Sequence, residues 1–307
     1  MILEINNKYC FLGKIENINK GDSWANITVI LEDGNKQNIK MEPTIIDNYE
    51  MNLVYYFETI CKEREGKPYL WLISSKTLYE YEDNPSVLAV LMEKFYDYAP
   101  KSKNEMQSII ESYLAQIKND NLKKIMNHIY QHHIDEFYVY PAATKFHHAY
   151  VGGLAYHTST MLKMMDSFID LYSYLNKDLL ISGIILHDMG KIYELSGAIG
   201  ASYTTKGQLI GHLVLEANEI SLAAKELDLL DSEEVVLLSH LVISSHGEPS
   251  FGAAKRPMIP EALLIWYFDT IDSKMTVIGE EFKNIDDNSF TEPISVLDRR
   301  KMFKHKI

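Results

Sequence analysis

This 307-residue chain has few cysteines, and its basic residues are outnumbered by acidic ones. Two cysteines, Cys10 and Cys61, cannot build a disulfide scaffold or a thiolate zinc site. There are 30 Lys and Arg against 43 Asp and Glu, a formal net charge of −13 with histidine neutral. This balance argues against tight, salt-driven wrapping of duplex DNA, which needs many cations at phosphates. Because bound metal ions neutralise clustered carboxylates, an enzyme that acts on nucleic acid stays compatible with the composition.

Long hydrophobic runs are absent as well. No stretch approaches the roughly 18 consecutive apolar residues that a membrane span needs. The first residues lack the basic start, apolar block and small-residue cleavage site of a secretion signal. We therefore expect a cytoplasmic protein with no membrane partner. At 46% hydrophobic and 24% charged residues, the chain has the composition of a folded globular protein.

The first part of the chain has the pattern of a small β domain. Five β-rich segments, at 11–18, 24–31, 36–41, 53–61 and 69–73, are separated by turn signals. One of these signals is Asp33-Gly34-Asn35, a hairpin turn. Strands at this spacing predict an OB-type barrel over residues 1–82, with an SH3-like barrel as the alternative.

Aromatic residues of this barrel are candidates for binding nucleic acid. Trp24 and Tyr69, together with Tyr55, Tyr56 and Trp71, would stack on bases if they lie on the barrel surface. Packing within the barrel is the alternative for each ring. Acidic residues outnumber basic ones in the first 80 positions, so no basic groove supports the binding interpretation.

From Asn84 onward the apolar residues recur with the period of a helix. We expect helices over 87–98, 105–117, 121–132, 154–175, 177–187, 206–227, 232–244 and 260–278, the last ended by Gly279. Residues 83–307 are therefore predicted to form an all-α domain. The fold class is α+β multidomain, a small barrel followed by a helical bundle.

Histidines and aspartates mark the functional part of this bundle. The dipeptide His187-Asp188 follows an apolar run, and the other candidates fall at separate helical segments amid apolar residues. A single helical histidine is usually a packing residue, but facing helices that contribute imidazoles and carboxylates build metal sites. A buried aspartate beside buried histidines also needs compensation, which a divalent cation supplies. The predicted ligands are His157, His187, Asp188 and Asp269 for one ion, and His212 and His246 for a second.

These residues and their surroundings resemble the HD-domain phosphohydrolase superfamily, and within it the YhaM family of 3′→5′ exoribonucleases. That family joins an N-terminal OB fold to an HD domain. Ser245 precedes His246 where family members carry a further histidine. The motifs that carry the resemblance are Tyr140-Pro141-Ala142-Ala143, His147-His148-Ala149, Gly153-Leu154-Ala155-Tyr156-His157-Thr158, Leu186-His187-Asp188, Glu194-Leu195-Ser196-Gly197, Gly211-His212, Arg256-Pro257 and Asp269-Thr270-Ile271-Asp272-Ser273.

Catalytic roles follow from the site and from the resemblance. We expect Asp188 to bridge two ions that activate a water for in-line attack. Lys191, three residues later and on nearly the same helical face, would stabilise charge on a phosphate oxygen. Asp272, one turn after Asp269, would orient a ligand or the attacking water. His148, as a wall of the site, and Arg256, near a substrate phosphate, are the remaining substrate-binding candidates together with Trp24, Tyr69 and Lys191.

The ligand set contains nitrogen and oxygen but no thiolate, which suits Mn²⁺ or a similar ion. The resemblance favours Mn²⁺, with Co²⁺, Fe²⁺, Ni²⁺ and Mg²⁺ as alternatives. It also implies 3′→5′ hydrolysis of single-stranded RNA, and of DNA as a further substrate, to nucleoside 5′-monophosphates. Two other functions stay open: an HD-type hydrolase of small nucleotides or cyclic dinucleotides, and an inactive nucleic-acid-binding adaptor. A homo-oligomer is compatible with the sequence.

Overall fold

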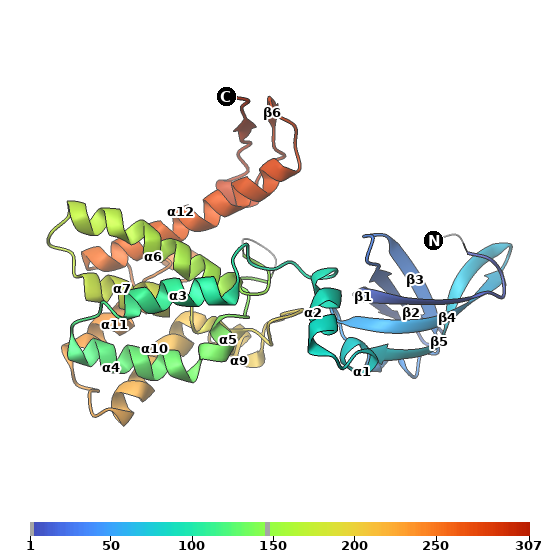
Figure 1. The fold of residues 1–307 in the computed structure, drawn as a ribbon, viewed down its shortest axis with the longest axis horizontal. Helices are drawn as coiled ribbons and strands as arrows, with labels where there is room; N and C mark the ends of the chain where they lie inside the picture. Colours follow the sequence, from blue (N-terminus) through green and yellow to red (C-terminus); the bar gives the residue numbers. More distant parts are fainter. Residues whose placement is uncertain (1–2, 145–147) are drawn as a thin grey trace. The chain divides into compact units, whose positions relative to one another are not determined.

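The computed structural model describes residues 3–144 and 148–307, so His147 of one sequence motif lies outside the described residues. The chain divides into two compact units, Met1–Asp97 and Tyr98–Ile307 (Figure 1). The first unit is built on β-strands and the second on helices, as the sequence predicts. Within the part of the chain that is described, no helix combines the length and apolar character needed to cross a bilayer.

A closed five-stranded barrel forms most of the first unit. Its strands are β1 (Lys8–Lys20), β2 (Ala25–Ile30), β3 (Lys36–Met41), β4 (Val54–Arg64) and β5 (Lys67–Thr77). They pair in the order β1-β2-β3-β5-β4, with β4 returning to β1 and with β3 parallel to β5. Alternate residues of β2 point into the barrel, where Ile27 and Val29 are fully buried. The OB-type barrel is therefore confirmed, and all five predicted strands are present.

The first unit reaches beyond residue 82, the boundary expected from the sequence. Two short helices, α1 (Leu78–Tyr81) and α2 (Pro85–Glu93), follow the barrel. Asn84 caps α2, and Pro85 begins it, where a missing N–H costs nothing. Leu88, Leu91 and Phe95 pack with Leu12 and Val54 of the barrel strands, so this segment stays on the barrel.

The second unit has one large helical core. Its helix α7, between Lys177 and Leu186, is buried from Leu179 to Leu186 and contacts α6, α11 and α12. A short hairpin, β6 (Ser289–Phe290) with β7 (Phe303–Lys304), follows the last helix. The helices are α3 (Lys103–Leu114), α4 (Asp120–His132), α5 (Ile134–Phe137), α6 (Gly153–Leu171), α7 (Lys177–Leu186), α8 (Lys191–Glu194), α9 (Thr205–Leu209), α10 (His212–Glu226), α11 (Glu233–Ile243) and α12 (Pro260–Lys283).

Two helix predictions were wrong. The helix expected over 206–227 is two helices, α9 and α10, because Gly211 adopts a φ of 80° that interrupts the helical backbone. This break places His212 at the first position of α10. Gly279 does not end α12, which continues to Lys283, since a single glycine inside a long packed helix lowers stability without stopping it.

Candidate metal centre and barrel face

Three helices bring the first predicted ligand group together. His157 lies in the first turns of α6, His187 directly follows α7, and Asp269 lies in α12. His157 Nε2 is 3.3 Å from His187 Nε2 and 3.5 Å from Asp269 Oδ1. One atom from each of these three residues lies within 4.8 Å of the other two, a spacing that a metal ion can fill.

Asp188 joins this group to a second one. Its Oδ2 lies 3.5 Å from His187 Nε2 and 3.8 Å from His157 Nε2. Its other oxygen, Oδ1, lies 3.4 Å from His212 Nε2. His212 Nε2 is in turn 3.3 Å from His246 Nε2. The two oxygens of one carboxylate therefore face two different pairs of imidazoles, which is the arrangement of a bridging ligand.

The protonation of the four imidazoles follows from their outer hydrogen bonds. Each Nδ1 faces a carboxylate or carbonyl oxygen that can only accept, so each Nδ1 carries the proton. In the neutral rings the four Nε2 atoms then present lone pairs to the centre, as metal ligands do. The acceptors are Asp272 for His157 at 2.6 Å, Ile184 for His187 at 2.8 Å, Glu194 for His212 at 2.9 Å and Phe251 for His246 at 3.0 Å.

The electrostatics of the centre favour positive charge. Burial alone would raise the pKa of Asp188, but Lys191 and the neighbouring histidines outweigh it and hold the pKa well below its ordinary value. Burial alone would lower the pKa of His157, but its hydrogen bond with Asp272 and the charge of Asp269 outweigh burial and raise it. A fixed, buried carboxylate surrounded by imidazole nitrogens is a donor set that fits divalent cations.

Residues behind the ligands fix their orientation. Asp272 accepts from His157 Nδ1 and lies 2.7 Å from His148 Nε2, so it holds a ligand rather than facing the pocket. Glu194 does the same for His212, whose backbone N–H it also accepts. Sequence analysis assigned no role to Glu194. Two signals could have identified it: its place in one of the motifs, and its position one turn after Lys191 on the short helix α8.

The remaining predicted residues divide between the pocket and its surroundings. Lys191 lines the pocket and donates to Asp188 Oδ2 at 2.7 Å. His148 is fully buried against Asp272 and is not among the described residues that line this pocket. Arg256 is exposed and pairs with Glu248 at 2.8 Å. Ser245 is buried, and its Oγ has no hydrogen-bond partner among the described residues. The pocket measures about 280 Å³, and the ionisable residues that line it are Asp188, Lys191, Glu194, His212, His246 and Asp269.

Close backbone packing sets the position of His212 relative to Asp188. The turn after α7 carries His187 and Asp188 and ends at Gly190. A Cβ atom at Gly190 would lie 2.4 Å from the carbonyl oxygen of His212 and 3.1 Å from Glu216 on α10. Glycine is therefore required where this turn crosses the start of α10.

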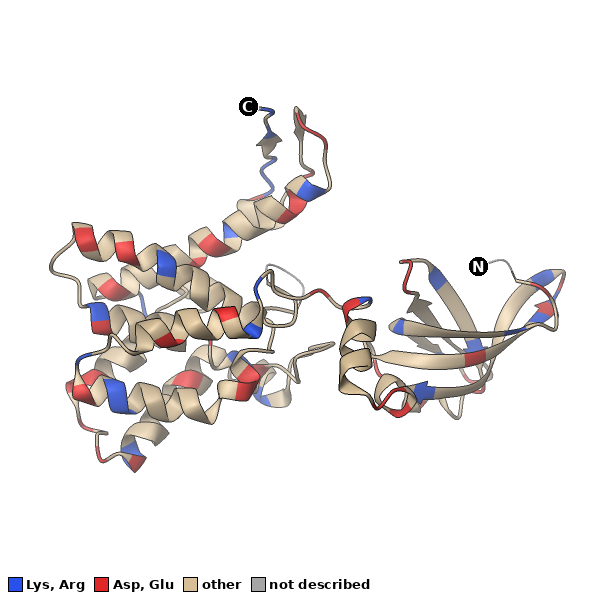
Figure 2. Ribbon diagram, in the orientation of Figure 1, with Lys and Arg blue, Asp and Glu red and all other residues tan. Residues whose placement is uncertain are grey.

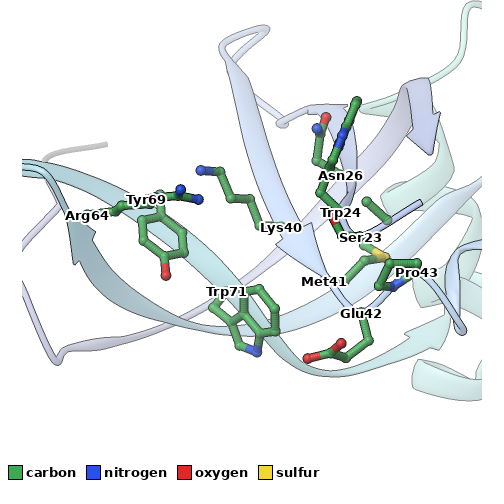
Figure 3. A pocket seen from close by; sticks show the side chains of 11 residues that line it. Ser23, Trp24, Asn26, Lys40, Met41, Glu42, Pro43, Arg64, Tyr69 and Trp71 are labelled. Atoms are coloured by element: carbon green, nitrogen blue, oxygen red, sulfur yellow. The ribbon is translucent and has the colours of Figure 1, made fainter. Parts of the chain in front are cut away.

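The barrel carries a second pocket, of about 490 Å³. It is lined by three of the aromatic residues that the sequence analysis named, Trp24, Tyr69 and Trp71, and by Lys40 and Arg64. Figure 3 shows Tyr69 and Trp71 of β5 on one side and Trp24 at the other. Trp24 is 53% exposed, whereas Tyr55, expected on the surface, is buried in the barrel core at 5%. Lys40 lies 4.5 Å above the ring of Tyr69. The pocket therefore combines exposed π faces with positive charge.

Acidic and basic residues are interspersed along most of the helices and strands (Figure 2). The positive charge of the barrel pocket is thus local. It comes from Lys40 and Arg64, with Lys62 placed 4.5 Å above the ring of Trp71.

No family model matches the chain. Individual proteins match it strongly. It is 38% identical over 285 residues to the 3′-5′ exoribonuclease YhaM of Bacillus subtilis strain 168, covering 91% of this chain and 88% of that protein. It is 42% identical over 215 residues to the protein of that name from Bacillus licheniformis, covering 70% of this chain and 68% of that protein. The chain belongs to the YhaM family of 3′→5′ exoribonucleases.

Proposed function

We propose that this chain is a metal-dependent exoribonuclease that removes nucleoside 5′-monophosphates from the 3′ end of single-stranded RNA. The observation that carries the proposal is the convergence of four Nε2 atoms on the two oxygens of Asp188. The relatives bear the name 3′-5′ exoribonuclease, which supports the direction of cleavage and RNA as the substrate. Single-stranded DNA is a second substrate under the same proposal.

Two divalent ions would be held by this centre. His157, His187, Asp188 and Asp269 would ligate one, and Asp188, His212 and His246 the other. Divalent cations supply charge neutralisation at phosphoryl oxygens and water of lowered pKa. We propose Mn²⁺ on the basis of the family resemblance; the nitrogen and oxygen ligands accept Mn²⁺ but do not select it over Co²⁺, Fe²⁺ or Ni²⁺.

The other charged residues have supporting roles. Lys191, half-enclosed beside Asp188, would place its ammonium near a non-bridging phosphate oxygen and stabilise charge that develops there. Asp272 and Glu194 would act through the imidazoles, keeping the Nδ1 proton and the direction of Nε2 fixed. His148 would support Asp272. We assign Asp272 to positioning rather than to proton transfer with the substrate.

The barrel would bind the RNA strand. Trp24, Tyr69 and Trp71 offer faces on which successive bases can stack without sequence preference, and Lys40 and Arg64 can contact phosphates. The unit that contains the barrel would thus hold substrate, and the helical unit would cleave it. The cytoplasmic location and a homo-oligomer stay predictions.

The experiment is cleavage of a 5′-labelled single-stranded RNA with Mn²⁺, with chelator, and with DNA of the same sequence. We expect a ladder that shortens from the 3′ end with Mn²⁺ and no product with chelator. Nucleotides and cyclic dinucleotides are tested in parallel, because hydrolysis of these with intact RNA would identify a small-nucleotide hydrolase instead. Asp170→Asn, which alters an exposed residue of α6, is the control for Asp188→Asn. Binding of RNA without any cleavage would identify an adaptor.

A further inference from the structure

A second group of metal-binding side chains lies where the end of α4 meets α10. His132, His133 and Glu219 each offer a ligand atom, and these atoms lie within 4.8 Å of one another. Tyr193 of α8 adds its hydroxyl, 2.9 Å from His133 Nε2. We refer to these four residues as the α4–α10 cluster. It shares no residue with the candidate metal centre.

The local backbone explains how two adjacent histidines can serve one site. On a regular helix, neighbouring side chains point about 100° apart. His132 is the last residue of α4, and His133 leaves the helical conformation with φ −111° and ψ 12°. Their rings meet edge to face, with centroids 4.7 Å apart. His132 is exposed while His133 is buried, so the cluster is open to solvent on one side.

The surroundings of the cluster are acidic. Glu216, one turn before Glu219 on α10, is fully buried, and neither of its carboxylate oxygens has a hydrogen-bond partner among the described residues. Burial raises its pKa well above the ordinary value, and the charge of Glu219 adds to the rise. The C-terminal end of α4 contributes the negative pole of the helix dipole at His132. The raised pKa favours the neutral form of Glu216, so a cation at this place would offset the charge of Glu219 and the negative pole of the helix.

The spacing of the cluster suits an ion better than a hydrogen bond alone. His133 Nε2 lies 3.5 Å from Glu219 Oε1, longer than a good hydrogen bond. Two ligands held about 2.0–2.1 Å from a tetrahedral ion are about 3.3–3.4 Å apart. In the candidate metal centre, the Nε2 atoms of each imidazole pair lie at a similar distance, 3.3 Å.

We propose that the α4–α10 cluster binds one divalent transition ion of the zinc class through His132, His133 and Glu219. Two imidazoles, one carboxylate and a water make a tetrahedral set that such ions accept. Binding would replace the contact of His133 with Tyr193, whose hydroxyl retains its hydrogen bond to Glu219. The ion would tie the end of α4 to α10, next to the helix α8 that carries Lys191 and Glu194.

Equilibrium dialysis of metal-free protein against Zn²⁺, followed by metal analysis, tests the proposal. His132→Ala and Glu219→Gln should each bind one ion fewer than the wild type. His128→Ala is the matched control, since His128 pairs with Glu226 at 3.3 Å across the same two helices but has no third ligand in the described groups. It should bind as many ions as the wild type. Equal ion counts in all four proteins would overturn the proposal and leave the cluster as a hydrogen-bond network.

The same measurement in an Asp188→Asn background separates this ion from those of the candidate metal centre. The difference of one ion between His128→Ala and His132→Ala should persist there. Zn²⁺ should also raise the melting temperature of Asp188→Asn, because a ligand that binds only the folded state stabilises it. That increase should be smaller when His132→Ala is added. An undiminished increase would contradict the proposal, and since His132 is exposed, its replacement leaves the core intact.

Discussion

The two pockets of this chain hold different kinds of side chain in opposite surroundings. In the helical unit, His157, His187 and Asp188 are buried to within a few per cent, and every imidazole is fixed by an outer hydrogen bond. In the barrel, Trp24 is half exposed, and lysine side chains lie above the rings of Tyr69 and Trp71. Chemistry at a phosphate needs ligands with one fixed direction, whereas stacking on successive bases tolerates many positions. We therefore expect single substitutions in the first pocket to cause large losses of RNA hydrolysis, and substitutions in the second pocket to cause small losses of RNA binding.

The largest effect is expected from Asp188→Asn, which weakens both ligand groups at once. Loss of several kcal/mol of charge stabilisation corresponds to a fall in RNA hydrolysis on the order of 10³-fold or more. The measurement is the rate of 3′ shortening with Mn²⁺, with circular dichroism to confirm the helices. Activity comparable to that of Asp170→Asn would disprove the bridging role.

Lys191→Met should reduce turnover by about 10²-fold while most metal binding is kept. The reason is that Lys191 contacts Asp188 through its Nζ but offers no ligand atom itself. Kcat and the ion content are measured on the same preparation. A loss of metal with unchanged turnover per bound ion would move Lys191 from catalysis to assembly of the centre.

In the barrel, Trp71→Ala should weaken binding of single-stranded RNA by about tenfold, within the roughly 1–3 kcal/mol that one stacked base contributes. Cleavage of a small phosphodiester such as bis-p-nitrophenyl phosphate should be unchanged, because this compound has no nucleotide chain that could bind the barrel. Tyr79→Ala, an exposed aromatic of α1 outside the pocket, is the control. Equal affinities of the two variants would remove stacking from the function of this pocket.

The smallest effect concerns stability at low pH. Burial alone would raise the pKa of Asp272, but hydrogen bonds from His148 and His157 outweigh it and lower the pKa. The unfolded chain therefore binds a proton at Asp272 before the folded chain does. Its contribution to the free energy of unfolding is complete above about pH 5 and is lost as pH falls through the lowered pKa.

Urea unfolding in chelator, compared between wild type and Asp272→Asn, measures this contribution. The Asp272 carboxyl should add no change to the difference between the two proteins from about pH 6 to 5. Below about pH 5 the difference should shrink by at most about 1.4 kcal/mol per pH unit, the limit for one proton. A difference that is already shrinking near pH 6 would show that the histidines, not Asp272, carry the titration.

The candidate ligands, which the structure brings together, could be named from sequence because their signals are local. His187-Asp188 ends a buried apolar helix, and each other ligand sits beside a helical segment with its own apolar pattern. The roles of Glu194 and His148 could not be found in this way. They depend on which residues α10 and α12 bring within hydrogen-bond distance, and no spacing along the chain encodes that contact.

In the fold, too, elements with a clear local sequence pattern were predicted and elements without one were missed. Five barrel strands were predicted because turns separate them clearly, but β6 and β7 have two residues each, too few for an alternating pattern. The break at Gly211 was missed because both flanking segments are apolar at helical spacing, and only the backbone conformation of that residue separates them.

Gly190 has a consequence for any attempt to redesign this chain. Because its side chain is only a hydrogen atom, the His187-Asp188 turn can lie against the first residue of α10. A methyl group at this position would overlap the carbonyl oxygen of His212 and would increase the distance between His212 and Asp188. None of the candidate ligands would change in the sequence. The distance between the two pairs of imidazoles is thus set by a residue that has no ligand atom.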